Sequence, residues 1–150
     1  MSALYPVICS SQPAESGVFY RRLFGFEPTF ESDWYVSLAS PDLRQQIAFI
    51  DYQHDSIPQG ASREPGGVLI TVEVDDVDAM YSRVVDLDLE TVLGVCEEPW
   101  GWRHFIIRDP HGLLVDVYKD ILPKDILPKD ILPKDEDAAD PTTIGLIETA

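Results

Sequence analysis

Residues 97–118 carry the side chains whose types and spacing could do chemistry. Trp100 and Trp102 flank a glycine, His104 follows them, and Asp116 lies in a run of apolar residues. Indole rings stack on flat organic molecules and attract cations, and an imidazole beside a carboxylate can move a proton. A charge among apolar residues is costly without a partner, so Asp116 needs an explanation. The stretch predicts either a binding surface for an aromatic cation or an acid–base pair.

Two strand-like runs must position these side chains. Residues 103–108 and 113–118 are rich in β-branched and aromatic residues, and Asp109-Pro110-His111-Gly112 joins them. Proline fixes φ at the second position of a turn, and glycine closes the turn without a steric clash, so the pattern predicts a β-hairpin. Alternation along the second run places Asp116 and Tyr118 on one face, together with Leu114.

The rest of the chain repeats one order of elements: a strand, a helix and three strands. Apolar residues with a period of two or of 3.6 residues, and breakers such as Gly, Pro, Asp and Ser, mark the boundaries. The expected elements are strands 4–9, 26–30, 34–39 and 47–51 with a helix from 11 or 12 to 24, then strands 68–74, 91–95, 103–108 and 113–118 with a helix from 76 to 87. We therefore expect an α+β fold of two tandem βαβββ modules, residues 3–51 and 67–118, which form cupped mixed sheets with the helices outside. Residues 52–66, rich in Gly, Pro, Ser and Gln, are expected to be a linker.

Composition narrows the classes of partner. A net charge of −16 argues against binding of nucleic acid, which needs clustered cations, whereas it would draw a cationic small molecule. No stretch approaches the roughly 18 apolar residues of a membrane span, and no basic and then apolar signal pattern opens the chain. These observations predict a soluble, cytoplasmic protein with a small organic partner. Cys9 and Cys96 have no metal-type spacing and are expected to be small buried residues.

The C-terminal residues 119–150 differ from the modules. Lys119-Asp120-Ile121-Leu122-Pro123 recurs at 124–128 and at 129–133. A period of five fits neither a helix nor a strand, and the proline in each copy interrupts both. We expect an extended or disordered tail. Its Ile-Leu pairs could dock on a neighbouring subunit, or the repeat could have no selected role.

Four motifs in this order resemble a known superfamily. They are Phe19-Tyr20-Arg21-Arg22-Leu23-Phe24-Gly25-Phe26, Val74-Asp75-Asp76-Val77, Trp100-Gly101 and Arg108-Asp109-Pro110-His111-Gly112. Over residues 3–118 the chain resembles the vicinal oxygen chelate superfamily, which includes glyoxalase I, fosfomycin resistance proteins, extradiol dioxygenases and bleomycin resistance proteins. The resemblance implies that Trp102, His104 and Ile106 lie on the cupped face, and that Phe105 and Ile107 lie under the helix.

The resemblance also indicates where a metal would be held. In metal-dependent members, His, Glu or Gln side chains from the first and last strands of each module bind a divalent ion. The corresponding positions here are Tyr5, Ala48, Leu69 and Asp116. Divalent cations need several oxygen, nitrogen or sulfur donors, and this set offers one carboxylate, one phenol and two aliphatic side chains. We therefore expect no metal and no other cofactor. His54 and His111 fall in a linker and a turn, where solvated positions are expected.

The metal-free branch resembles bleomycin resistance proteins, which are cytoplasmic dimers that bind an antibiotic in clefts at the subunit interface without chemistry. Glu98-Pro99-Trp100-Gly101 and Asp33-Trp34 are similar to patterns of that group. The resemblance implies a homodimer that sequesters an aromatic ligand, such as an antibiotic, whose cationic part meets acidic groups. The residues expected to bind this ligand are Tyr5, Trp34, Asp51, Trp100, Trp102, His104 and Asp116.

The alternative is an enzyme of the same superfamily. A lyase, isomerase or dioxygenase would either depend on a metal or use His104 with Asp116 or Tyr5 as acid–base groups. Sequence alone leaves this alternative open, because acid–base catalysis requires the groups to lie within hydrogen-bond reach of a substrate.

Overall fold

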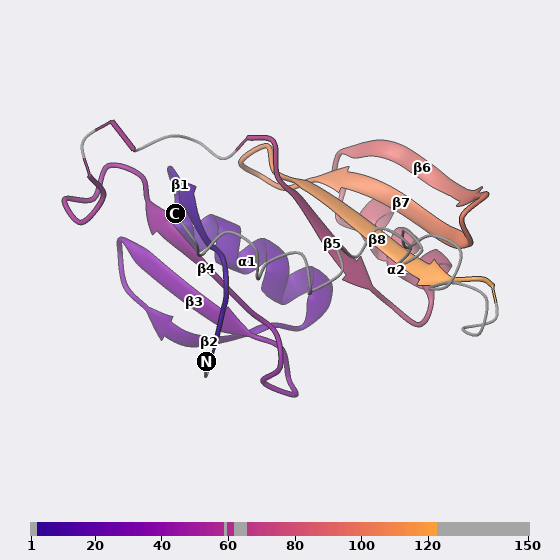
Figure 1. Ribbon diagram of the computed structural model, residues 1–150, viewed down its shortest axis with the longest axis horizontal. Coiled ribbons are helices and arrows are strands. Elements are labelled where there is room, and N and C mark those ends of the chain that lie inside the picture. Colours follow the sequence, from indigo (N-terminus) through magenta and orange to yellow (C-terminus); the bar gives the residue numbers. More distant parts are fainter. Residues whose placement is uncertain (1–2, 59, 62–65, 123–150) are drawn as a thin grey trace, which may run out of the picture.

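The structure is a computed structural model that describes residues 3–58, 60–61 and 66–122. Figure 1 shows two modules side by side along the long axis of the molecule, each with its own sheet and helix. Most of the predicted tail, from residue 123 onward, lies outside the described residues.

The first module has the predicted order of elements. They are β1 (Val7–Ser10), α1 (Pro13–Phe24), β2 (Glu27–Glu31), β3 (Tyr35–Ala39) and β4 (Gln46–Asp51). The strands lie in the order β1-β4-β3-β2, with β1 parallel to β4 and the other neighbours antiparallel. The first strand begins later than predicted, just after Pro6. This proline has no N–H to donate to a sheet, although its carbonyl accepts from the backbone N–H of Ala48 at 3.0 Å.

The second module repeats the arrangement. Its elements are β5 (Leu69–Glu73), α2 (Val77–Asp86), β6 (Thr91–Glu98), β7 (Trp102–Arg108) and β8 (Leu114–Asp120), and the strand order is β5-β8-β7-β6. The predicted fold of two βαβββ modules with mixed sheets is therefore confirmed. Two strands run longer than predicted, since β6 continues past Val95 to Glu98 and β8 continues past Tyr118 to Asp120.

Local signals set the ends of both helices. Gln12 is the N-cap of α1, and Pro13 occupies the first turn, where no N–H is needed. Gly25 ends this helix with φ at 70°, a left-handed conformation that suits glycine. Asp76 caps α2, as predicted, because its carboxylate accepts from the backbone N–H of Ala79 at 2.9 Å. Neither helix of the described chain is long and apolar enough to cross a membrane.

One hydrophobic core holds each helix against a single face of its sheet. The buried strand residues of this core are Ile8, Val36, Leu38, Ile47 and Phe49 in the first module, and Phe105, Ile107, Val115 and Val117 in the second. The ring of Tyr81 in α2 packs against Phe105 at 5.1 Å, which places the 105/107 face under the helix as predicted. Because side chains alternate along a strand, the opposite face of each sheet is free to carry a site.

A buried hydrogen bond ties the two modules together. Tyr20 in α1 donates its hydroxyl to Asp109 Oδ2 at 3.2 Å, in the turn before β8. Asp109 Oδ1 accepts from the backbone N–H groups of His111 and Leu113, both at 2.9 Å, so the same carboxylate closes the predicted hairpin turn. Burial raises the pKa of Tyr20, and the charge of Asp109 and the hydrogen bond to it raise this pKa further.

The raised pKa of Tyr20 predicts a loss of stability at alkaline pH. The unfolded chain ionises this tyrosine near its ordinary pKa of 10.0, whereas the folded chain keeps the proton. The free energy of unfolding should therefore fall as the pH rises above that value. Tyr20→Phe should reduce this fall, and at neutral pH it should cost about 1 kcal/mol because one hydrogen bond is lost. Urea denaturation at neutral and at alkaline pH measures both effects.

Tyr52→Phe provides the control, because Tyr52 is only partly buried. This variant should keep the alkaline loss of the parent chain. The prediction is wrong if Tyr20→Phe has the same pH dependence as the parent.

Candidate functional site

The face of the second sheet that points away from α2 gathers the predicted site residues of this module. On β7, His104 lies directly opposite Tyr118 of β8 and Cys96 of β6, and Ile106 lies opposite Asp116. Directly opposed residues share a face, so these side chains lie on one surface, which we call the open face. Its residues are Leu69, Thr71, Glu73, Leu93, Cys96, Glu98, Trp102, His104, Ile106, Arg108, Leu114, Asp116, Tyr118 and Asp120.

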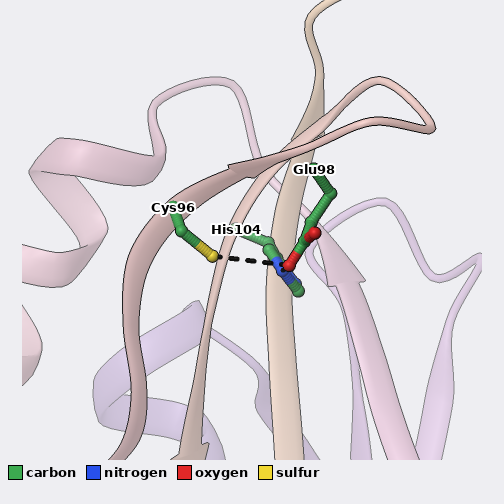
Figure 2. Close-up of side chains that lie close together, drawn as sticks. All are labelled: Cys96, Glu98 and His104. Carbon is green, nitrogen blue, oxygen red and sulfur yellow. Dashed lines mark hydrogen bonds and ion pairs between the residues drawn. The ribbon is translucent and has the colours of Figure 1, made fainter.

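His104 is the centre of a buried polar network on the open face. Its Nδ1 lies 2.8 Å from Asp116 Oδ1, and its Nε2 lies 3.2 Å from Glu98 Oε1. His104 and Asp116 are 4% and 5% exposed, so water contributes little to these contacts. The thiol of Cys96 adds a contact of 3.6 Å to the same Glu98 oxygen (Figure 2). The partner that the buried Asp116 requires is therefore His104.

The network favours a proton on His104. Burial lowers the pKa of this imidazole, but hydrogen bonds to Asp116 and Glu98 and the negative charges of both outweigh burial, and the pKa is raised above its usual 6.5. Burial also raises the pKa of the Cys96 thiol, and its contact with Glu98 raises it further. The two carboxylates thus favour the protonated form of His104, and the neutral thiol of Cys96 is favoured beside it.

Aromatic rings border this network. Trp102 stacks on Tyr118, with ring centroids 3.9 Å apart and planes at 18°. Trp100 meets Trp102 edge-on at 6.5 Å and His104 edge-on at 6.1 Å. Tyr118 therefore covers one face of Trp102, while Trp100 is 46% exposed and accessible to a flat molecule.

Three predicted site residues lie in the first module, apart from this network. Trp34 stacks on His54, with centroids 3.8 Å apart and planes at 9°, so this histidine packs on a ring rather than being simply solvated. Tyr5 is exposed just before β1. Asp51 ends β4, and its carboxylate accepts from a backbone N–H of the following loop at 2.9 Å. The structure brings together the four predicted residues of the second module but not these three.

Cys96 and Glu98 are missing from the predicted site, because the predicted strand ends at Val95. In the structure β6 continues to Glu98, so both side chains share a face with His104. The signal that identifies them is the Cys-x-Glu spacing, which puts the thiol and the carboxylate on one face of an extended strand. Cys96 is partly buried and contacts polar groups, so the prediction of a small buried apolar residue is wrong for it.

The positions where the resemblance places metal ligands do not form a set of donors. Ala48 is fully buried in β4. Leu69 lies on β5, opposite Leu114 of β8. Neither side chain carries a donor atom, and Asp116 is engaged by His104. The residues present therefore do not fit a metal centre of that type.

A cleft of about 1170 Å³ runs between the modules. The end of α1, the turn between β3 and β4, and strand β5 line this cleft, and it reaches the open face through Thr71, Glu73 and Tyr118. His104 and Asp116 are not among its lining residues. The polar network therefore lies on the sheet surface beside the cleft.

Known proteins share the fold of this chain. A family model described as the Glyoxalase/Bleomycin resistance protein/Dioxygenase superfamily matches residues 3–117, which span both modules and the polar network. The chain belongs to this superfamily. The resemblance carried by the four sequence motifs is thus confirmed. No curated protein matches the chain.

Several solved structures share the fold of this chain. A superfamily enzyme from Burkholderia phytofirmans PsJN has a TM-score of 0.68 and 20% identity, and the match covers 79% of this chain and 97% of that one. Lactoylglutathione lyase from Agrobacterium tumefaciens has a TM-score of 0.64 and 23% identity over 79% and 94% of the two chains. TioX from Micromonospora sp. ML1 has a TM-score of 0.61 and 20% identity over 80% and 99%. At these identities the likeness concerns the fold alone.

Removal of Asp116 should destabilise the folded protein. Asp116→Ala leaves His104 Nδ1 without its buried partner, and breaking such a pair costs about 3–5 kcal/mol in the free energy of unfolding. Urea denaturation at neutral pH measures the loss. Glu90→Ala is the control, because Glu90 and Arg108 form an exposed ion pair at 3.2 Å, for which about 1 kcal/mol or less is expected. Equal losses in the two variants would contradict a structural role of the His104–Asp116 pair.

Proposed function

We propose that this superfamily member binds a small organic molecule with an aromatic ring and a positive charge at the open face. The contacts are non-covalent, and binding needs no metal at Tyr5, Ala48, Leu69 and Asp116. The observation that carries the proposal is the exposed ring of Trp100 beside a network with two carboxylates, Glu98 and Asp116. The ring of the ligand would stack on Trp100, and its cationic part would meet Glu98. An antibiotic of this chemistry is one such molecule, and sequestration in the cytoplasm would be the role.

The charges around the open face support a cationic ligand. The pKa of Tyr118 is raised first by burial and then by the negative charges of Glu73, Asp120 and Asp116. Several carboxylates therefore act on the ring stack of Trp102 and Tyr118. The net charge of −16 adds a long-range attraction for cations.

The geometry of His104 favours binding over acid–base catalysis. A general base needs a nitrogen within hydrogen-bond reach of the substrate. Both ring nitrogens of His104 are already engaged, Nδ1 by Asp116 and Nε2 by Glu98, and the side chain is buried. A substrate would first have to displace Glu98. The 2.8 Å contact between His104 and Asp116 is the observation that favours the alternative, an acid–base enzyme such as a lyase or isomerase.

Ligand binding can be measured by quenching of tryptophan fluorescence in the full chain after removal of metals with EDTA. Bleomycin and the planar cation ethidium serve as probes, and the anion 8-anilinonaphthalene-1-sulfonate tests the preference for positive charge. We expect saturable quenching by at least one cationic probe and none by the anion. Trp100→Ala should weaken binding by about 2- to 13-fold, which corresponds to the about 0.5–1.5 kcal/mol of an aromatic contact.

Trp34→Phe is the matched control, because Trp34 stacks on His54 in the first module. It should lower the total fluorescence without changing the affinity. Absence of saturable quenching by both cationic probes, or equal weakening by Trp34→Phe and Trp100→Ala, would contradict the proposed site.

We also propose that two copies of the chain associate. Strands β1 and β5 are edge strands, and apolar side chains are exposed on or beside them, at Leu4, Val7, Val68 and Leu69. Unpaired edges with exposed apolar residues favour pairing with another chain. In a homodimer of the kind that the resemblance implies, the ligand would bind in a cleft at the subunit interface.

Light scattering coupled to size-exclusion chromatography tests the dimer. The parent chain should have about twice its own mass of 16.8 kDa. Val7→Lys places a charge on the exposed edge of β1 and should yield the monomer, whereas Val85→Lys on the exposed side of α2 should not. A parent chain that elutes with the mass of a monomer would contradict the proposal.

A further inference from the structure

We infer that Cys96, Glu98 and His104 form a binding site for a divalent cation of the zinc type. One donor atom from each of the three side chains lies within 4.8 Å of the other two. These donors come from β6 and β7, so the site differs from the positions at Tyr5, Ala48, Leu69 and Asp116 that the superfamily resemblance indicates. The inference also goes beyond the proposed function, because a metal can bind here without any organic molecule.

Two neighbouring strands bring the donors to one side of the sheet. Cys96 and Glu98 alternate along β6, and His104 on β7 lies directly opposite Cys96. Figure 2 shows the side chains of Cys96 and His104 extending from adjacent strands toward the carboxylate of Glu98. Because all three residues belong to hydrogen-bonded strands, the backbone that carries the donors is held in place before a metal arrives.

The distances between the donors suit a tetrahedral ion. Zinc bonds of about 2.0–2.3 Å set neighbouring donors roughly 3.3–3.8 Å apart. In the structure, Glu98 Oε1 lies 3.2 Å from His104 Nε2 and 3.6 Å from Cys96 Sγ. The third separation, between the donors of Cys96 and His104, lies within 4.8 Å, so side-chain shifts can bring all three donors to the distances of a tetrahedral ion.

Asp116 supplies the hydrogen bond that metal-binding histidines usually make through their second ring nitrogen. Its Oδ1 lies 2.8 Å from His104 Nδ1. In a neutral imidazole this contact keeps the proton on Nδ1 and leaves the lone pair of Nε2 directed toward Glu98 and Cys96. Both His104 and Asp116 are buried, which fixes the orientation of the ring. Asp116 is thus a positioning residue rather than a ligand.

The types of donor select the class of metal. A thiolate, an imidazole and a carboxylate suit Zn²⁺, whereas Ca²⁺ and Mg²⁺ prefer oxygen donors. Binding needs Cys96 as a thiolate and His104 Nε2 without a proton, so any proton held on either atom leaves to solvent. The negative charges of Cys96 and Glu98 then balance the ion. A tetrahedral ion with three protein donors keeps a fourth position for water or for a donor atom of a bound molecule.

The test is a titration of the full chain with Co²⁺ and then Zn²⁺, after removal of metals with EDTA and in a reductant without thiols. We expect a near-ultraviolet sulfur-to-cobalt charge-transfer band and visible bands of tetrahedral cobalt, which saturate at one ion per chain. Zinc should displace the cobalt and abolish these bands. Competition with a chromogenic chelator gives the affinity for zinc.

Matched variants assign the donors. Cys96→Ser should remove the charge-transfer band, whereas Cys9→Ser in the first module should keep it. Glu98→Gln should weaken zinc binding, whereas Glu97→Gln should not, because Glu97 is the next residue on β6 and pairs with Arg103 at 3.4 Å. Asp116→Asn should weaken zinc binding by about 10- to 100-fold, as expected for a residue that orients a ligand, while the charge-transfer band remains. Circular dichroism verifies the fold of each variant.

Two outcomes would overturn the inference. One is the absence of a charge-transfer band at saturating cobalt. The other is zinc binding that is equal in the parent chain, Cys96→Ser and Glu98→Gln, which would indicate adventitious binding to the acidic surface. The fluorescence experiment uses protein without metal, so quenching without zinc binding defeats this inference alone, and zinc binding without quenching defeats the proposed function alone.

Discussion

The contact between Asp116 and His104 gives a buried carboxylate its hydrogen-bond partner. Asp116 lies on β8 between Val115 and Val117, two residues of the hydrophobic core. A buried carboxylate without a partner would oppose folding by several kcal/mol. The same contact holds the imidazole of His104 in place, and its second ring nitrogen can then face Glu98 and Cys96. The chemistry of the open face therefore follows from a requirement of folding. The zinc site inferred on this face depends on the orientation that Asp116 gives to the His104 ring.

The two modules depend on each other as well as on their own helices. Their buried side chains form one continuous core, and Tyr20 of the first module reaches Asp109 in a turn of the second. That turn connects the strands that carry His104 and Asp116. Tyr20 of α1 therefore contacts the turn between these two strands, although no residue of α1 belongs to the open face. In this sense the first module supports a site whose polar network lies in the second.

The sequence predicted the order of elements, the two modules and the face of β8 that carries Asp116, because each rests on local periodicity and on turn residues such as Pro110 and Gly112. The face of β7 that carries His104 was implied by the resemblance to the superfamily. The end of β6 could not be predicted in the same way. Cys96-Glu97-Glu98 lacks apolar alternation and precedes a proline, so it has the pattern of a loop, and pairing with β7 is what extends the strand. The partner of Asp116 depends on the register between strands, which no local pattern encodes. Trp34 packs on His54 because of the conformation of a loop, and loop conformations carry the weakest sequence signals.

Lys119 and Asp120, the first residues of the repeated pentapeptide, also belong to strand β8. Lys119 and Asp120 pair with Arg103 and Trp102 across the sheet, and the backbone N–H of Ile121 donates to the carbonyl of Gly101 at 2.9 Å. These residues are repeat units in the sequence and sheet residues in the fold. Mutations in this copy are therefore constrained by the strand that carries His104, whatever constraint the repeat itself imposes. The first two residues of the repeat, Lys119 and Asp120, are therefore also the last two residues of β8.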